Sequence, residues 1–242
     1  MNLLGMQGFE NAVHHSSVLC LKVLSSSSLP KDSVVRITAR GYEYSLRNAK
    51  DGNTFFGCKK RLKGSVVNDF VVPIDDPAVA EQQRGQHFVI YFDLTTEKYV
   101  IRDLAMGFGT FVRLDTPLVL KDNCLVNVGD SFLLINLESE CRIKLTLFGT
   151  PSNGDVFNYE PCDATIFIGR MEKCQVHISD PLISTVQASL YCEQGNWILE
   201  DGDVSLDRRS TNATWIYLNE SYEMYTGMIF KANNTLFQVN IV

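Results

Sequence analysis

The chain has 242 residues, enough for one large domain or two small ones. Its hydrophobic content of 45% and charged content of 21% are typical of folded globular proteins rather than disordered chains. The net charge of −6 argues against non-specific nucleic-acid binding, and no apolar run is long enough to span a bilayer, so we expect neither nucleic acid nor membrane as a partner.

The predicted elements are short strands between turn signals, and no segment has sustained helical periodicity. An N-terminal extension at 1–32, with a possible extra strand, precedes them. The strands predicted in the first half are 34–38, 42–46, 54–56, 88–92, 98–102 and 110–113. Those predicted in the second half are 142–148, 164–168, 188–191, 197–200, 214–218 and 235–242, with a loop at 149–154. The sequence therefore predicts an all-β protein with few or no long helices.

The two halves of the sequence repeat each other. The clearest correspondences pair residues 54–58 with 166–170, 86–90 with 186–190, 99–103 with 197–201, and 126–132 with 224–230. A repeat of this length indicates two similar domains. We expect them at 33–139 and 140–242, with the boundary near 137–141.

Small polar groups recur in the predicted loops of the second half. They are Gly169-Arg170, Ser184-Thr185, Ser210-Thr211-Asn212, and Thr214 with Asn219 behind it. A phosphate dianion needs a forked cation, hydroxyl donors, backbone N–H groups and an amide, and these segments supply all of them. The spacing therefore indicates a phosphate-recognition site assembled from loops between strands.

Both halves resemble forkhead-associated (FHA) domains, small β-sandwiches that bind phosphothreonine peptides. The family signature of Gly-Arg, Ser-x-x-His and Ser-x-Asn-Gly-Thr can be followed through each half, and the resemblance covers most of the chain. It implies two tandem FHA-like sandwiches. It further implies that Arg170 makes the main charged contact, that the Ser184 hydroxyl and the Thr185 backbone contact phosphate oxygens, and that Thr211 and Asn212 hold the phosphothreonine and the peptide backbone.

The remaining motif positions have structural roles in the family, and several depart from its pattern. Gln187 stands where the family has a structural His, although its amide can still donate a hydrogen bond. Ala213 replaces the motif Gly, which would cost roughly 1 kcal/mol if the position needs a positive φ. Tyr217 occupies the place of the final Asn. Gly169, Ser210, Thr214 and Asn219 complete the set. The segment 202–209 lengthens one loop, and it could bring Arg208 and Arg209 to an anion or block the groove.

The first repeat lacks the phosphate-binding groups. Cys58 sits at the Arg position, Arg84 at the Ser position, Met106 at the first Ser and Phe108 at the Asn, which leaves only His87, Gly109 and Thr110. We expect the Met106–Phe108 loop to be a protein-contact surface or a self-packed loop. The basic residues of segment 59–63 could bind an acidic partner or act as a nuclear-localisation patch, or simply form a solvated loop.

No catalytic motif is complete. Gly52 and Gly57 have the separation of the two P-loop glycines, but Cys58 replaces the required Lys. Gly107-x-Gly109 lacks a third Gly, and no Gly-x-Ser-x-Gly elbow occurs. We therefore expect a binding module that is not an enzyme.

Two hypotheses remain for its role. One is a phosphothreonine-binding adaptor that acts through the second domain, while other protein subunits contact the first. The other is a structural scaffold that uses both domains as phosphate-independent docking surfaces in a larger cytoskeletal or ciliary assembly.

The cysteines bear on the compartment. Seven are dispersed without a C-x-x-C pair, which indicates neither a disulfide framework nor a zinc site. We expect no signal peptide, no cofactor and no metal. A reducing intracellular compartment fits best, the cytoplasm first, with the cytoskeleton, the cilium or the nucleus as alternatives.

Overall fold

The computed structural model describes residues 17–47, 51–74, 78, 85–138, 142–149, 153–161 and 164–242. Strands joined by turns dominate these residues, and Val204–Leu206 forms a 3-10 turn. None of the helices within these ranges has the length and apolar character needed to cross a membrane. Arg84, which the sequence places at a first-repeat motif position, lies outside the described residues.

The strands carry the alternation that the sequence predicts. In β1 (Leu19–Ser25) the side chains of Leu19, Leu21 and Val23 are buried, and those between them are partly exposed. A period of two places one face of the strand on the core and the other towards solvent. The all-β fold class is confirmed.

The chain forms two compact units. Unit 1 combines the segment that ends at Thr110 with Leu218–Val242, and unit 2 is Phe111–Tyr217. Unit 2 is therefore one continuous segment, whereas unit 1 is built from two segments that lie far apart in the sequence.

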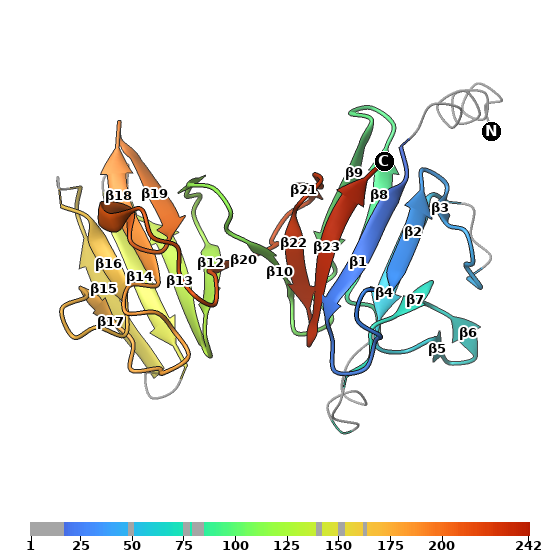
Figure 1. Cartoon of the computed structure of the whole chain (residues 1–242), viewed down its shortest axis with the longest axis horizontal. Coiled ribbons are helices and arrows are strands. Elements are labelled where there is room, and N and C mark those ends of the chain that lie inside the picture. The colour runs from blue at the N-terminus through green and yellow to red at the C-terminus, as the bar shows by residue number, and fades with distance from the viewer. Residues whose placement is uncertain are drawn as a thin grey trace. The chain divides into compact units, whose positions relative to one another are not determined.

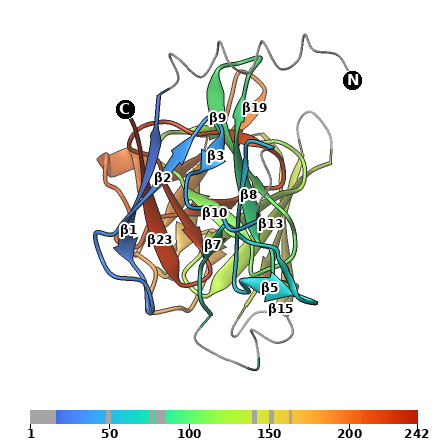
Figure 2. The ribbon, with the colours of Figure 1, turned by 90° about the vertical axis from the view of Figure 1, so that its right-hand side faces the viewer.

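Unit 1 contains two main sheets, with strand orders β22-β23-β1-β2-β3 and β21-β9-β8-β4-β7, and a β5-β6 hairpin. Figure 1 and Figure 2 both show the C-terminal strand β23 in red beside the blue β1. Besides β1, its strands are β2 (Val34–Thr38), β3 (Gly41–Tyr42), β4 (Asn53–Gly57), β5 (Arg61–Leu62), β6 (Ser65–Val66), β7 (Phe70–Val71), β8 (Phe88–Asp93), β9 (Lys98–Asp103), β21 (Tyr222–Glu223), β22 (Ile229–Ala232) and β23 (Thr235–Ile241).

The core of unit 1 is rich in aromatic rings. Phe88 stacks on Phe56 with ring centroids 4.5 Å apart, and it meets Phe230 edge-on at 5.7 Å. Phe230 in turn stacks on Phe237 at 5.0 Å. All four rings are fully buried. Because Phe230 and Phe237 come from the C-terminal segment, unit 1 cannot complete its core without that segment.

Unit 2 also has two sheets, with orders β15-β14-β13-β12-β20-β10 and β11-β19-β18-β16-β17. Aliphatic side chains from both sheets form its core, among them Val126, Ile135, Leu145, Ile168 and Leu199. Its strands are β10 (Thr110–Arg113), β11 (Leu118–Val119), β12 (Cys124–Val128), β13 (Ser131–Leu137), β14 (Ile143–Phe148), β15 (Asn153–Tyr159), β16 (Ile166–Gly169), β17 (Val176–His177), β18 (Ala188–Glu193), β19 (Asn196–Asp201) and β20 (Trp215–Tyr217).

The smaller sheets of the two units have the same topology and the same register. In each, a two-residue strand pairs in parallel with the first strand, and three antiparallel neighbours follow. Residues that correspond in the sequence repeat also occupy corresponding rungs. The equivalent pairs are Phe56 with Phe88 and Ile168 with Ala188, then Phe88 with Asp103 and Ala188 with Asp201.

The last three strands of each predicted repeat lie in the unit that contains most of the other predicted repeat, an arrangement we call the strand exchange. β11, β12 and β13 belong to the first repeat in sequence but complete unit 2, and β21, β22 and β23 belong to the second but complete unit 1. β11 pairs with β19 through Leu118 and Leu199, and β21 pairs with β9 through Tyr222 and Ile101. Ile101 and Leu199 correspond in the predicted repeat. β11 therefore occupies in unit 2 the position that β21 occupies in unit 1.

The compact units thus contain other segments than the predicted domains at 33–139 and 140–242. The predicted boundary near 137–141 falls between β13 and β14, which pair with each other inside unit 2. The extension at 1–32 contains β1, which pairs with both β2 and β23. The predicted segments describe repeats in the sequence, and the strand exchange separates those repeats from the units that fold together.

Candidate functional site

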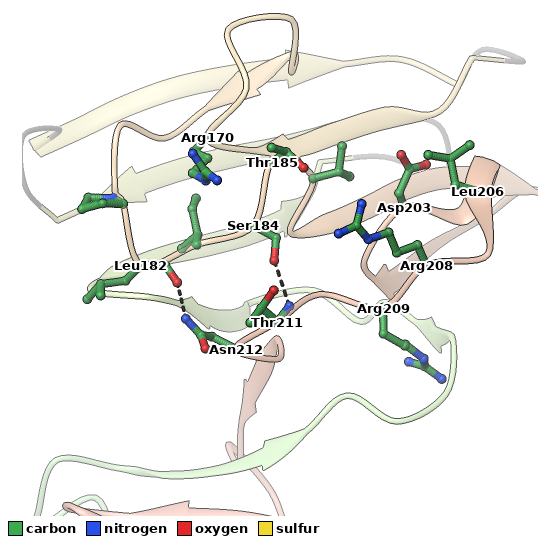
Figure 3. Close-up of a pocket in the computed structure, with 13 residues that line it drawn as sticks. Arg170, Leu182, Ser184, Thr185, Asp203, Leu206, Arg208, Arg209, Thr211 and Asn212 are labelled. Carbon is green, nitrogen blue, oxygen red and sulfur yellow. Dashed lines mark hydrogen bonds between the residues drawn. The ribbon is translucent and has the colours of Figure 1, made fainter.

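One pocket of about 400 Å³ lies where three loops of unit 2 meet. The loops follow β16, precede β18 and join β19 to β20. Figure 3 shows that the labelled side chains come from all three loops. The lining residues are Arg170, Pro181, Leu182, Ile183, Ser184, Thr185, Val186, Asp203, Leu206, Arg208, Arg209, Thr211 and Asn212. All five residues predicted to bind the phosphopeptide are among them.

A close backbone approach positions Arg170. β16 ends at Gly169, and a Cβ there would collide with the carbonyl oxygen of Thr185, so the position requires glycine. Beyond it, the backbone N–H of Arg170 donates to the Ser184 carbonyl oxygen at 3.1 Å. The backbone N–H of Met171 donates to the Thr185 carbonyl oxygen at 3.1 Å. The Arg170 side chain is exposed, and among the described residues no salt bridge engages it.

Ser184 connects two of the loops. Its hydroxyl oxygen accepts the Thr211 N–H at 2.8 Å, which leaves the hydroxyl proton available for an anion. The Asn212 side-chain amide donates to the Leu182 carbonyl oxygen, a second link between the same loops. Both links appear as dashed lines in Figure 3. The hydroxyl and the carboxamide are therefore fixed relative to each other.

The fully buried side chain of Gln187 links the loop that contains Ser184 to the loop that joins β19 to β20. Its side-chain oxygen accepts the Ser184 N–H at 3.0 Å. Its amide nitrogen donates to the Ala213 carbonyl oxygen at 2.9 Å and to the Ser210 hydroxyl at 3.0 Å. The sequence-based expectation that this glutamine still donates a hydrogen bond is confirmed, and the amide contacts both loops.

The hydroxyl groups of Ser210 and Thr214 donate hydrogen bonds to other residues of unit 2. The Ser210 hydroxyl donates to the Asp201 carboxylate at 2.7 Å, and its N–H donates to the other carboxylate oxygen at 3.1 Å. The buried Thr214 hydroxyl donates to the Gln187 carbonyl oxygen at 3.2 Å. These contacts fix the backbone on either side of Thr211 and Asn212.

Ala213 adopts a left-handed backbone with a φ of 59°. The position thus has the positive φ for which the family uses glycine, and the Cβ adds strain. Asn212 is nevertheless held on both sides, because the Trp215 indole N–H donates to its carbonyl oxygen at 3.2 Å. The substitution strains the turn without displacing it from the pocket.

The lengthened loop at 202–209 separates its two arginines. The Arg209 guanidinium donates to the carbonyl oxygens of Asp115 at 2.6 Å and Leu114 at 3.4 Å. Figure 3 shows the Arg208 head directed towards the pocket and the Arg209 head turned away from it. Of the two predicted possibilities, the loop brings Arg208 to the pocket. Asn219, by contrast, belongs to unit 1 and does not line the pocket.

The equivalent region of unit 1 has the same close backbone approach at a glycine but different side chains around it. A Cβ at Gly57 would collide with the Gly85 carbonyl oxygen, as at Gly169 in unit 2. The next residue is Cys58, whose thiol pKa is raised by burial. His87 is buried, and its Nδ1 lies 2.9 Å from the Asn233 amide nitrogen. Phe108 exposes 54% of its surface. No guanidinium stands at the Arg170 equivalent.

Comparison with known families gives one match, in which the FHA domain family model covers residues 166–231. A comparison with curated proteins found no match. FHA domains are phosphopeptide-binding modules rather than catalytic ones, so the match supports a non-catalytic binding role for this segment. The matched segment runs from β16 in unit 2 to β22 in unit 1, and it contains every residue that lines the pocket.

The polar groups of the pocket were predicted from the sequence, but its apolar wall was not. Pro181, Leu182 and Leu206 line it and are exposed. The only signal for them was their position beside the polar motif residues, because an isolated exposed apolar side chain is common on protein surfaces.

Proposed function

We propose that unit 2 binds phosphothreonine peptides and that the protein is a non-catalytic adaptor. The observation that carries the proposal is the shared pocket of Arg170, Ser184, Thr211 and Asn212, which come from three loops. The planar guanidinium can satisfy two phosphate oxygens at once, and the Ser184 hydroxyl retains a proton to donate. In this proposal the carboxamide of Asn212 contacts the peptide backbone that flanks the phosphate.

The energies suit a reversible interaction. Each charge-assisted hydrogen bond contributes on the order of 1.5–3 kcal/mol, and micromolar affinity requires about 8 kcal/mol. Three or four contacts from Arg170, Ser184, Thr185 and Thr211 would supply this. Binding that depends on a removable phosphate is then a switch.

We further propose that the chain is a tandem FHA protein whose first phosphate site has degenerated. The matching strand orders and registers of the two small sheets support the tandem, and Cys58 in place of the arginine supports the loss of the site. In this proposal unit 1 contacts other protein subunits without phosphate, and the exposed ring of Phe108 supplies apolar area for the contact.

The test is a pull-down on a phosphothreonine peptide library with the full chain. We expect Arg170→Ala to lose recovery of phosphorylated peptides, whereas Lys173→Ala, which removes an exposed cation outside the pocket lining, should behave like wild type. Equal recovery by Arg170→Ala and wild type would overturn the adaptor and favour the phosphate-independent scaffold.

A further inference from the structure

Two arginines face the pocket, and the proposed phosphothreonine needs only one of them. In the view of Figure 3 the head groups of Arg170 and Arg208 stand on opposite sides of Ser184. Neither guanidinium takes part in a salt bridge among the described residues. Both are exposed, and both line the same pocket.

The backbone beneath Arg208 is fixed rather than loose. The Asp203 N–H donates to the Arg208 carbonyl oxygen at 2.7 Å, and the Arg208 N–H donates to the Asp203 backbone carbonyl oxygen at 3.1 Å. A Cβ at Gly202 would collide with the Arg208 carbonyl oxygen, so glycine permits this closure. The buried Ser189 hydroxyl donates to the Gly202 carbonyl oxygen at 2.7 Å and anchors the loop to the sheet.

The neighbouring charged side chains keep their charge but are bound to other groups. Arg209 is engaged by the Leu114 and Asp115 carbonyl oxygens. The Asp203 carboxylate, the acidic group of the lining, accepts the N–H and the hydroxyl of Ser205 at 3.0 and 2.6 Å. Arg208 is therefore the cation that this loop presents to a ligand.

We propose that Arg208 reads a second anionic side chain on the same peptide, so that the pocket selects peptides with a negative group beside the phosphothreonine. This inference rests on the proposed function, because Arg170 must hold the phosphothreonine first. The chemistry that fits Arg208 is a carboxylate or a second phosphate, since a guanidinium binds either one with two parallel hydrogen bonds.

The experiment measures peptide binding to the full chain by fluorescence anisotropy. The reference probe is a peptide with one phosphothreonine and neutral flanking residues. Two scanned series place either Glu or a second phosphothreonine at each flanking position in turn, which separates the two sources of negative charge. The variants are Arg208→Gln and Arg209→Gln, which remove equal charge from adjacent residues, with thermal unfolding as the check that both fold.

We expect at least one scanned position to strengthen binding to wild type. Arg208→Gln should weaken that two-anion peptide about tenfold or more, the loss of one charge-assisted contact, and leave the reference peptide unchanged. Arg209→Gln should preserve the preference. If Arg209→Gln proves unstable, Lys173→Gln is the charge-matched control.

Three outcomes would overturn the inference while leaving the proposed function intact. In the first, no scanned position gains affinity. In the second, Arg208→Gln weakens the reference peptide as much as the two-anion peptide, so that both arginines hold one phosphate. In the third, Arg208→Gln and the control weaken the two-anion peptide equally, which is a long-range charge effect. Failure of wild type to bind any phosphopeptide would instead reject the proposed function.

Discussion

At the scale of single residues, one corresponding buried position holds different side chains in the two units. Gln187 in unit 2 and His87 in unit 1 correspond in the sequence repeat, and both are buried under a loop junction. Gln187 offers an acceptor and a two-proton donor, and it bonds to two of the three pocket loops, at Ser184 and at Ala213. In His87, the ring nitrogen Nδ1 is hydrogen-bonded to the Asn233 side chain. The other ring nitrogen, Nε2, is buried without a hydrogen-bond partner among the described residues.

Gln187→Leu tests the glutamine. The substitution leaves the Ser184 N–H and the Ala213 carbonyl without their partner, so we expect unit 2 to lose about 2 kcal/mol or more of unfolding free energy. Phosphopeptide affinity should fall as well, because the Ser184 loop loses its support. Gln187→His, which restores one donor and one acceptor, should lose less. Urea unfolding and peptide titration measure the two effects, and a stable, fully binding Gln187→Leu would contradict this account.

His87 predicts an acid sensitivity. Burial lowers its pKa below the usual 6.5, and the nearby Asp103 opposes this only in part. The unfolded chain therefore takes up a proton at a higher pH than the folded chain does. The stability from the neutral ring is complete above about pH 6.5, and it is lost as the pH falls through the folded pKa.

We expect His87→Gln to flatten the dependence of the urea midpoint on pH between about 7 and 5, a window that brackets the histidine pKa. His177→Gln, at an exposed histidine, should retain the slope of wild type. Identical slopes for all three proteins would show that His87 does not contribute.

Ala213 is a strained residue with a simple remedy. At a φ of 59° a side chain is unfavourable, so Ala213→Gly should stabilise unit 2 by about 0.5–1 kcal/mol. A glycine at an ordinary negative φ would instead destabilise it by a similar amount. The sign of the change in unfolding free energy decides the matter, and a loss would mean that the turn is not left-handed in solution.

At the scale of elements, several strands were predicted close to their observed bounds, whereas β12, β13 and β22 were not predicted and only Tyr42 of the predicted strand 42–46 lies in a strand. β2 and β10 have the bounds predicted, and β4, β8, β9 and β23 differ by at most a residue at each end. β15 was missed because its sequence, Asn-Gly-Asp-Val-Phe-Asn-Tyr, begins with turn formers. It lies at the edge of its sheet, where a strand pairs on only one side.

The end of β16 makes the pocket depend on a glycine. Gly169→Ala would push the Thr185 backbone away, and we expect a loss of about 1–3 kcal/mol together with weaker phosphopeptide binding. Gly57→Ala meets the same obstacle at Gly85 in unit 1, so it should destabilise that unit while unit 2 still binds peptide. Calorimetry with peptide titration separates the two effects. Unchanged binding by a folded Gly169→Ala would contradict the proposed geometry.

The candidate site was predicted in its polar members because a phosphate site needs few residue types at ordered loop positions. Arg170, Ser184 and Asn212 line one pocket, as their spacing suggested. The different directions of Arg208 and Arg209 could not be predicted, because they depend on which carbonyl oxygens of the segment after β10 come within reach. Short-range sequence pattern contains no such information.

At the scale of the whole molecule, the strand exchange could not be predicted either. Hydrophobic alternation helps to set the register in which a strand pairs, but it does not specify which strand is the neighbour. Because the two repeats share pattern and register, β11 and β21 satisfy the same rungs in either unit.

The exchange predicts which fragment folds. Residues 110–217 contain every strand of unit 2, so this fragment should unfold cooperatively and retain phosphopeptide binding. Residues 140–242 contain one full repeat but lack β11, β12 and β13, and we expect that fragment to be poorly folded or to associate with itself. Circular dichroism and size-exclusion chromatography compare them. A monomeric, cooperative 140–242 fragment would contradict the exchange.

The pairing of β1 with β23 also bears on how the protein is made. On the ribosome, unit 2 has all of its strands once Tyr217 has emerged, whereas unit 1 must wait for β22 and β23. The aromatic rings of Phe56 and Phe88 therefore stay uncovered until Phe230 and Phe237 have been added. Premature termination shortly after Tyr217 would release a complete unit 2 joined to an incomplete unit 1 that is prone to aggregate.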